Sequence, residues 1–393
     1  MRIESVDIFY LAMPEVRDVG DGSQDMALVR VRGGGYTGWG ECEASPLPTI
    51  AAMVAPMSHS ACHNVLDSVL DETVDGPGSI RTLARRVAAR GLDLLQTDHA
   101  WSGVEIALWD LLGRSRGEPV HALLGVDRAV PRTPYASQLF GDDPAATYRR
   151  AREVARAGYR AAKFGWGPYG TGDVREDADH LMAAREGLGH EADLLIDAGT
   201  VWGSDVGAAA ARLPALEEAR VVWLEEPFDS GALDAYAALA RLSSRVRLAG
   251  GEGAHNAHQA RHLIAHGGIG YVQVDTGRIG GIGPARDVAL YARERGVRFV
   301  NHTFTSHLAL SASLHPYADS TEDLLCEYPV APAALAHDLT RTHLVPDAAG
   351  LLHLPEAPGL GIALDLDAVR PYLRQVEIVV DGTCLYRTPD LIP

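Results

Sequence analysis

Three acidic residues end three successive apolar stretches in the middle of the chain. The stretches are DLLID, VVWLEEPF and RLAGGEG, and the acids are Asp197, Glu225 and Glu252. The acids are 28 and 27 residues apart, a spacing that matches one strand–helix unit of a parallel barrel. In such a barrel the carboxyl ends of all strands lie on one face, so the three carboxylates are expected to converge on a common pocket.

Carboxylates that converge repel one another unless a cation lies between them. This set offers oxygen ligands only, which favours the hard ion Mg²⁺ over Zn²⁺. A single acid just after a strand could instead cap a helix, but three acids at one repeat favour a metal site. We therefore predict that Asp197, Glu225 and Glu252 bind Mg²⁺.

Further ionisable residues continue this series along the chain. In order, the predicted strand ends carry Lys163, Asp197, Glu225, Glu252, Asp275, His302 and Glu327. A purely structural barrel would not place so many charges at equivalent positions, because each would need its own partner. Asp275 and His302 end neighbouring strands, so the carboxylate can orient one imidazole nitrogen while the other faces the pocket as a base. A histidine taken alone would more often be a core residue.

Lys163 is the only lysine of the chain, and the other basic residues are 34 arginines. Arginine stays charged at any working pH, whereas an ammonium is a compact charge whose pKa can move. A site that needs an ammonium therefore cannot use arginine. Chance retention of one lysine is the alternative, but its place among the acids favours a role in the site.

Eight apolar stretches alternate with stretches of helical length from about residue 130 onward. The expected strands are TPYASQLF, RAAKFG, DLLID, VVWLE, RLAGGE, YVQVD, RFVNH and DLLCE. Eight such units are what a closed α/β barrel needs. We predict a modified TIM barrel with its catalytic rim over residues 128–347.

The remaining residues have other patterns. Residues 1–45 alternate apolar and polar positions around a turn at Gly33–Gly35, which predicts an antiparallel meander. Residues 51–125 have helical spacing, with Ser102 as an expected N-cap, whereas ASPLPTIAAM before them is expected to be irregular. The predicted organisation is an α+β capping domain over 1–127, the barrel, and a C-terminal segment over 348–393 that packs back on the capping domain.

The net charge indicates which partners are disfavoured, and the cysteine spacing indicates the compartment. The net charge of −17 disfavours nucleic acid and anionic membranes, which would both repel the chain. Four cysteines without a CxxC spacing fit a reduced, cytoplasmic setting. We expect neither a signal peptide nor a membrane span, because no basic segment precedes a long apolar run. We also expect a homo-oligomer.

Taken together, the motifs resemble the enolase superfamily and, within it, the mandelate racemase subgroup. They are GWGE, ALWDLLG, the lysine of the second barrel strand, the acids of LLID, WLEEP and GGE, then VQVD, NH and a late PGLGIALD, and they span nearly the whole chain. The resemblance implies a capping domain over a (β/α)₇β barrel and one Mg²⁺ on Asp197, Glu225 and Glu252, with Glu226 outside the ligand set. It also implies a small carboxylate substrate that loses the proton next to its carboxylate to a Lys or His base, giving an ene-diolate that Mg²⁺ stabilises.

One departure from the family pattern bears on the reaction. The subgroup often has Lys-x-Lys at the end of the second strand, and here the run is Lys163-Phe164-Gly165. Lys163 matches the lysine that binds the substrate carboxylate, and Gly165 takes the usual base position; a shift of two residues would make Lys163 the base. With Gly165 opposite His302, one side of the substrate lacks an acid–base group. Dehydration is then favoured, because His302 alone can remove the α-proton and protonate the leaving β-hydroxyl.

The sequence thus predicts a Mg²⁺-dependent dehydratase, a hydro-lyase, of a sugar acid of the aldonate or aldarate kind. The product would be a 2-keto-3-deoxy acid, and Glu327 would hydrogen-bond the developing ene-diolate. Two alternatives stay open: a racemase or epimerase of a 2-hydroxy acid, and a non-catalytic metal-binding barrel protein.

Other residues are weaker candidates. Four histidines of GAHNAHQARHLIAH are expected on the solvated face of a helix with Asn256 as its N-cap. Trp166, Tyr169 and Arg17 are candidates for substrate binding, and Tyr169 is also a candidate base. Arg278 could meet a polar group of the substrate, although an exposed side chain is the more ordinary expectation.

Overall fold

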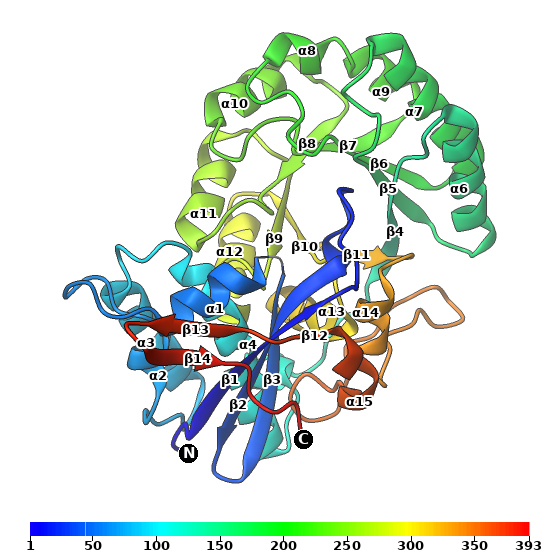
Figure 1. Ribbon diagram of the computed structural model, residues 1–393. Coiled ribbons are helices and arrows are strands. Elements are labelled where there is room, and N and C mark those ends of the chain that lie inside the picture. Colours follow the sequence, from blue (N-terminus) through cyan, green and yellow to red (C-terminus); the bar gives the residue numbers. More distant parts are fainter. Residues whose placement is uncertain (44, 393) are drawn as a thin grey trace.

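The computed structural model describes residues 1–43 and 45–392. The chain forms a small antiparallel sheet with helices at its side and a large parallel sheet ringed by helices (Figure 1). The colours of the figure show that both ends of the chain lie with the small sheet, whereas the middle of the chain forms the large one.

The small sheet contains the predicted meander. Its strands are β1 (Ser5–Ala12), β2 (Asp25–Gly33) and β3 (Tyr36–Glu43), which pair antiparallel in chain order. Gly34 and Gly35 make the β2–β3 turn with φ angles of 59° and 80°. Glycine adopts this left-handed region without steric cost, so the prediction of a turn at the glycine run is confirmed.

Five helices follow the meander: α1 (Pro46–Val54), α2 (Leu66–Val69), α3 (Pro77–Arg90), α4 (Thr97–Arg116) and α5 (Val120–Leu123). The longest of them, α4, packs against β3. A side chain at Gly38 or Gly40 would collide with backbone atoms of α4. The GWG motif therefore allows the helix to lie directly on the strand.

Two predictions for this region are wrong. The stretch expected to be irregular forms α1, because Pro46 lies in the first helical turn, where a missing N–H costs nothing; Ala44 of that stretch lies outside the described residues. Ser102 is not an N-cap but lies inside α4, five residues after its start at Thr97. Its hydroxyl donates to the carbonyl of Asp98 and accepts from Gly280 N, both at 2.8 Å.

The large sheet contains all eight predicted strands. They are β4 (Thr133–Leu139), β5 (Ala161–Gly165), β6 (Asp193–Asp197), β7 (Val221–Glu225), β8 (Arg247–Gly250), β9 (Tyr271–Asp275), β10 (Arg298–His302) and β11 (Leu325–Pro329). All pair in parallel, in the order β10-β9-β8-β7-β6-β5-β4-β11. At the junction of β10 and β11, the Asn301 side chain accepts a hydrogen bond from Glu327 N at 2.9 Å. The predicted fold class, a modified TIM barrel with an α+β cap, is confirmed.

Helices surround this barrel on the outside (Figure 1). They are α6 (Pro144–Arg156), α7 (Val174–Leu188), α8 (Val206–Ala210), α9 (Leu213–Glu218), α10 (Leu233–Leu242), α11 (Ala257–His266), α12 (Ile282–Glu294), α13 (His307–Leu314) and α14 (Ala334–Asp338). Asn256 caps α11 by accepting from Gln259 N at 3.0 Å, and the four histidines of this segment lie on or just before the helix. The expectation of an N-capped helix here is confirmed.

The barrel interior is filled by an apolar layer formed by Tyr135, Ala161, Leu195, Trp223, Ala249 and Val300. Side chains alternate between the two faces of a strand, so the residue two positions further along faces the same interior. The positions two residues further along are Ser137, Lys163, Asp197, Glu225 and His302 on their strands, and Gly251 directly after β8. The apolar layer is thus followed by a layer of mostly polar and ionisable groups at the carboxyl ends.

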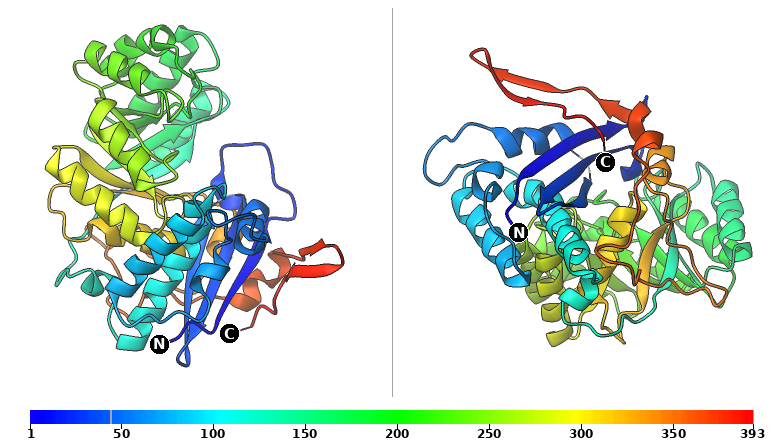
Figure 2. Two further views of the ribbon diagram at one scale, coloured as in Figure 1. Left: turned by 90° about the vertical axis from the view of Figure 1, so that its left-hand side faces the viewer. Right: turned by 90° about the horizontal axis from the view of Figure 1, so that it is seen from below.

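The C-terminal residues return to the small sheet. β12 (Leu373–Arg374) pairs antiparallel with β1, after the short α15 (Leu366–Val369). β13 (Glu377–Val380) and β14 (Thr383–Arg387) form a hairpin that projects from the body of the molecule (Figure 2). Short 3₁₀ helices lie at Gly22–Gln24, His315–Tyr317 and Arg370–Tyr372.

Two further expectations can be compared with the structure. The four cysteines, Cys42, Cys62, Cys326 and Cys384, are all free thiols. No helix in the described part of the chain has the length and apolar character needed to cross a membrane.

Candidate metal and acid–base site

The three acids predicted to bind a metal converge. Asp197 and Glu225 are the last residues of β6 and β7 and are Cα partners in the ladder. Glu252 lies two residues beyond the end of β8, so the prediction that this strand ends on the acid is wrong. One carboxylate oxygen from each residue lies within 4.8 Å of those of the other two. Gly251, at φ 125°, turns the chain between β8 and Glu252.

Lys163 lies beneath these acids, in the middle of β5 and not at its end as expected. Its Nζ is 2.6 Å from Glu225 Oε1, 2.9 Å from Glu327 Oε1 and 3.5 Å from Asp197 Oδ2. Burial favours the neutral amine, but the neighbouring carboxylates outweigh it and hold the pKa of Lys163 well above its ordinary value. The lone lysine is therefore a buried cation that joins the acids of three strands.

Asp275 and His302 form the predicted pair. They are Cα partners at the ends of β9 and β10, and His302 Nδ1 lies 2.8 Å from Asp275 Oδ2. The other ring nitrogen, Nε2, is 3.1 Å from Glu252 Oε2 and thus faces the acid cluster. Burial opposes charge on both groups; even so, the hydrogen bond from His302 lowers the pKa of Asp275 to about 2. Glu252 and Glu327 outweigh burial to hold the pKa of His302 well above its ordinary value.

Glu327 lies in the middle of β11, so the expected strand end there is also wrong. The residue is fully buried, and its carboxylate accepts from Ser137 Oγ and from Thr303 N, both at 2.8 Å. With the ion pair to Lys163, each oxygen of Glu327 has a partner. Glu327 therefore closes the ring of polar residues between β11 and β4.

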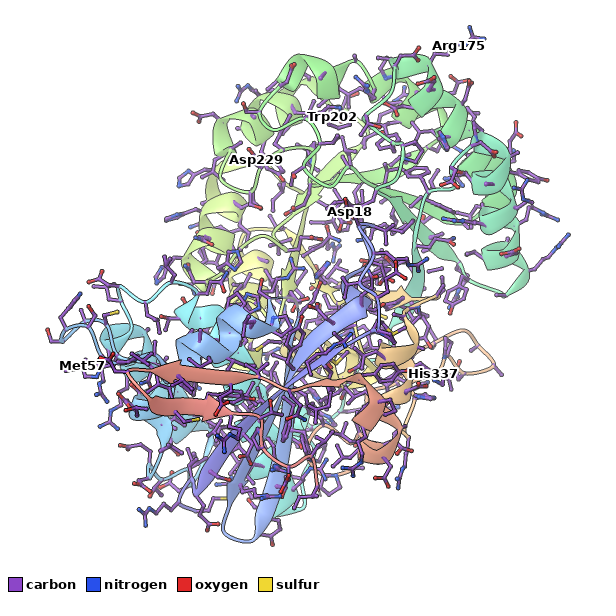
Figure 3. All side chains as sticks on the ribbon, in the orientation of Figure 1. Asp18, Met57, Arg175, Trp202, Asp229 and His337 are labelled. Atoms are coloured by element: carbon purple, nitrogen blue, oxygen red, sulfur yellow. The ribbon has the colours of Figure 1, made fainter. Side chains whose placement is uncertain are left out.

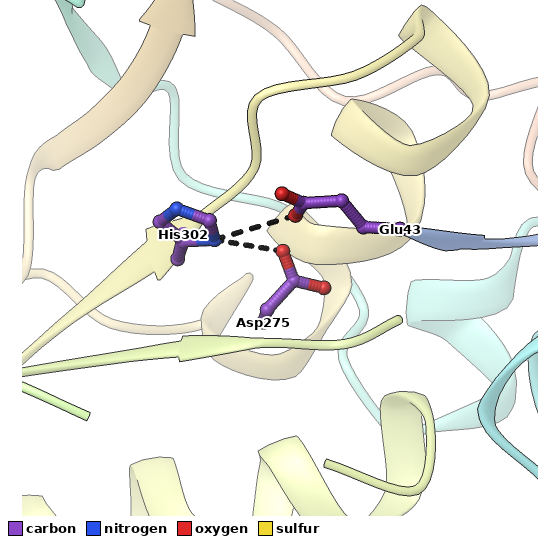
Figure 4. Close-up of side chains that lie close together, drawn as sticks. All are labelled: Glu43, Asp275 and His302. Atoms are coloured by element: carbon purple, nitrogen blue, oxygen red, sulfur yellow. Dashed lines mark hydrogen bonds and ion pairs between the residues drawn. The ribbon is translucent and has the colours of Figure 1, made fainter. Parts of the chain in front are cut away.

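Glu43, at the end of β3 in the capping sheet, is a site residue that the sequence reasoning missed. Its Oε2 lies 3.7 Å from His302 Nδ1, and Glu43, Asp275 and His302 form a second close group of ligand-type side chains (Figure 4). The GWGECEA motif gave a signal, because alternation places Glu41 and Glu43 on one face of the strand. The sequence does not show that the end of β3 contacts the barrel, so the approach of Glu43 to His302 could not be predicted.

Arg278 joins Glu43 to the acid cluster. Its guanidinium is 2.7 Å from Glu43 Oε1 and 3.7 Å from Glu252 Oε1, and it also donates to the Glu252 carbonyl at 3.3 Å. Burial alone would lower the pKa of Arg278, but Glu43 and Glu252 raise it. The expectation of an ordinary exposed arginine is wrong, because the side chain is mostly enclosed between the cap and the barrel.

The residues proposed for substrate binding are more dispersed. Trp166 is 44% exposed and lies against Gly20 and Gly199, so it touches both the β1–β2 connection and the barrel. That connection extends toward the strand ends, as the position of Asp18 shows (Figure 3). Arg17 is exposed on the same connection.

Tyr169 lies in a separate aromatic cluster. Its ring stacks on Phe140 with centroids 5.1 Å apart and contacts Trp202 edge-on at 6.1 Å. The side chain is buried, and burial raises the pKa of its hydroxyl far above the ordinary value. A phenol that resists ionisation in this way is a poor candidate for a base.

The acid cluster fits a divalent cation. Three carboxylates supply oxygen ligands only, and the ligand-type atoms of the set are close enough to share one ion. Glu226, next to Glu225 in sequence, accepts from Gly251 N at 3.1 Å and so supports the turn that carries Glu252. The donor set is therefore suited to Mg²⁺, and Glu226 supports the segment that carries Glu252.

This fold and this site define a barrel enzyme family, and the chain belongs to it. Residues 146–369 match the family model described as Enolase C-terminal domain-like, and residues 16–125 match the Mandelate racemase / muconate lactonizing enzyme N-terminal domain. The chain is therefore a member of the enolase superfamily, in its mandelate racemase subgroup.

Particular relatives are similar over most of their length. A crystal structure of a predicted mandelate racemase from Rhodobacter sphaeroides is 57% identical, has a TM-score of 0.94 and covers 99% of this chain and 100% of its own. The D-galactarolactone cycloisomerase of Agrobacterium fabrum is 29% identical over 86% of this chain and 88% of its own. The D-galactonate dehydratase of Xanthomonas oryzae pv. oryzae is 28% identical over 86% of this chain and 87% of its own. Members of this family thus include both lyases and isomerases.

Proposed function

We propose that the protein is a Mg²⁺-dependent dehydratase of a sugar acid, of the aldonate or aldarate kind, which forms a 2-keto-3-deoxy acid. The observation that carries the proposal is the one-sided placement of the acid–base groups. His302, oriented by Asp275, directs its Nε2 toward the acid cluster. On β5, the position that would carry a second lysine is Gly165, and a β-carbon there would lie 2.7 Å from Asp197 Cβ.

A single base suits dehydration better than racemisation. A racemase takes a proton from one face of the α-carbon and returns one to the other, so it needs two groups. In dehydration, His302 Nε2 accepts the α-proton and then donates it to the departing β-hydroxyl. The C–O bond breaks, water leaves, and the resulting enol becomes the 2-keto acid. All atoms of the substrate are accounted for without a second base.

The other residues of the site have roles that follow from their charges. Mg²⁺, held by Asp197, Glu225 and Glu252, would supply Lewis-acid stabilisation of the negative charge that develops next to the α-carbon. Lys163 adds a fixed positive charge under Glu225 and Glu327. Asp275 holds the imidazole in one orientation and favours its protonated form after the first step.

The named relatives support the chemical class of substrate. D-galactonate is an aldonate, and galactarolactone derives from an aldarate, so two of the compared proteins act by name on acids of these kinds. A cytoplasmic location and a homo-oligomeric state are part of the proposal. Isomerisation is the competing reaction, and the cycloisomerase relative favours it.

A substrate screen tests the proposal. The protein is incubated with Mg²⁺ and a panel of aldonates and aldarates, and 2-oxo acid is detected with semicarbazide. We expect at least one acid to yield a 2-oxo acid that depends on Mg²⁺. Deuterium entering the α-carbon in D₂O without loss of water would indicate a racemase or epimerase. Absence of any reaction across the panel would reject the dehydratase.

A further inference from the structure

We infer that Glu43 is a positioning residue for the metal site: by anchoring Arg278 it keeps the carboxylate of Glu252 free to bind the cation. This inference rests on the cation site of the proposed function. It concerns a capping-domain residue that is not itself one of the three converging acids.

The guanidinium of Arg278 lies near two acids, at different distances. Its guanidinium makes a hydrogen-bonded ion pair with Glu43 at 2.7 Å, whereas its nearest approach to a Glu252 side-chain oxygen is 3.7 Å. The shorter contact of Arg278 is thus with Glu43 of the capping domain, and the longer one is with Glu252, a predicted metal ligand. Among the described residues, these two acids are the ones within ion-pair distance of Arg278.

Glu43 is buried and closely surrounded by its neighbours. Its carbonyl lies 2.8 Å from His99 Nε2 of α4. A β-carbon on Gly22 would lie 2.5 Å from Glu43 Oε1, and one on Gly277 would lie 3.2 Å from Glu43 N. Glycines of two segments therefore lie close against this residue, and a side chain at either position would require Glu43 or its neighbours to shift.

Replacement of Glu43 is expected to change the position of the Arg278 side chain. If Glu43 is replaced by glutamine, the guanidinium of Arg278 has Glu252 as its remaining acidic partner within ion-pair distance. A shift of about 1 Å would bring it into hydrogen-bonding range of Glu252, where it would compete directly with the cation. Changes at groups that orient metal ligands typically weaken metal binding by about 10- to 100-fold.

Isothermal titration of the 393-residue chain with Mg²⁺ tests this inference. Glu43→Gln should raise the Kd for Mg²⁺ by about tenfold, with little change in the melting temperature. The double variant Glu43→Gln/Arg278→Gln should recover most of the lost affinity, because the competing cation is gone. Arg278→Gln alone should bind Mg²⁺ at least as tightly as the unmodified protein.

A matched control is available on the same strand. Glu41 is also buried on β3, but it bonds Ser306 and not Arg278. Glu41→Gln should leave the Kd for Mg²⁺ unchanged. The inference is overturned if Glu43→Gln binds Mg²⁺ normally, if the double variant stays as weak as Glu43→Gln, or if Glu41→Gln is equally weak.

The outcome can be separated from that of the proposed reaction. If the unmodified protein binds Mg²⁺ but dehydrates no sugar acid, the reaction is wrong while the Glu43 variants still test the inference by their Kd values. If the unmodified protein binds no Mg²⁺, the inference fails together with the cation site.

Discussion

Gly165 and Asp197 face each other as Cα partners across β5 and β6, and a β-carbon on Gly165 would lie 2.7 Å from Asp197 Cβ. Real β-carbons are almost never this close, so Gly165→Ala must displace the Asp197 side chain. We expect Gly165→Ala to weaken Mg²⁺ binding by about tenfold or more, measured by isothermal titration. The matched control is Gly78→Ala on the exposed face of α3, where a β-carbon meets nothing within 4 Å. Unchanged Mg²⁺ affinity in Gly165→Ala would argue against Asp197 as a ligand.

His302 is predicted to be the base, and its substitution tests that role. His302→Asn should reduce the rate of 2-oxo acid formation by at least about 100-fold, since general-base catalysis typically contributes 10²- to 10⁴-fold. The 2-oxo acid is detected with semicarbazide, using an acid that reacts in the substrate screen, and Mg²⁺ affinity is measured alongside to show that the site is intact. His262→Asn, on the exposed face of α11, is the control. An unchanged rate in His302→Asn would assign the proton transfer to another group.

The barrel could be predicted from sequence because its pattern is local and repeated. Each strand is a short apolar stretch, and the acids recur at the strand–helix period. The predicted strand ends are less accurate. Glu252 lies two residues past the end of β8, and Glu327 lies in the middle of β11. These errors arise because the sequence shows where an apolar stretch stops but not where the backbone leaves the ladder.

The role of Glu43 could not be predicted, because it depends on how two domains pack. Nothing in the ECEA sequence shows that β3 ends against the barrel, and nothing near Arg278 in sequence shows that its partner lies 235 residues away. The close packing at Gly277, next to Arg278, is equally invisible until the fold is known. The ionisable residues of the barrel strands could be predicted from their spacing, whereas the contact of Glu43 with Arg278 across the two domains could not.

At the contact between the capping domain and the barrel, a buried carboxylate caps the N-terminus of α12. Its contribution to the stability of the fold can be measured. Glu105 of α4 accepts from Ile282 N at 2.7 Å and from Gly283 N at 2.9 Å, the first N–H groups of α12, and also from Trp109 Nε1. Glu105→Ala leaves these buried donors without a partner and should lower the free energy of unfolding by about 3 kcal/mol, measured with urea. Glu118→Ala, at an exposed position just after α4, should change it by less than about 0.5 kcal/mol. Equal effects of the two variants would contradict the capping role.

The ion pairs of Asp319 predict a dependence of stability on pH. Hydrogen bonds from Arg286, at 2.5 and 3.1 Å, and weaker contacts with Arg293 hold the pKa of Asp319 below its ordinary value near 3.8. A lowered pKa means that the folded state binds the proton less readily than the unfolded chain. The stabilisation is therefore present above pH 3.8 and is lost as the pH falls toward the folded-state pKa. Asp319→Asn should lower the urea midpoint at pH 7, by an amount equivalent to about 1 kcal/mol because the group is partly exposed. The difference between the two proteins should shrink below pH 3.8, and a difference that is constant from pH 7 to pH 3 would show that the contribution of Asp319 is not electrostatic.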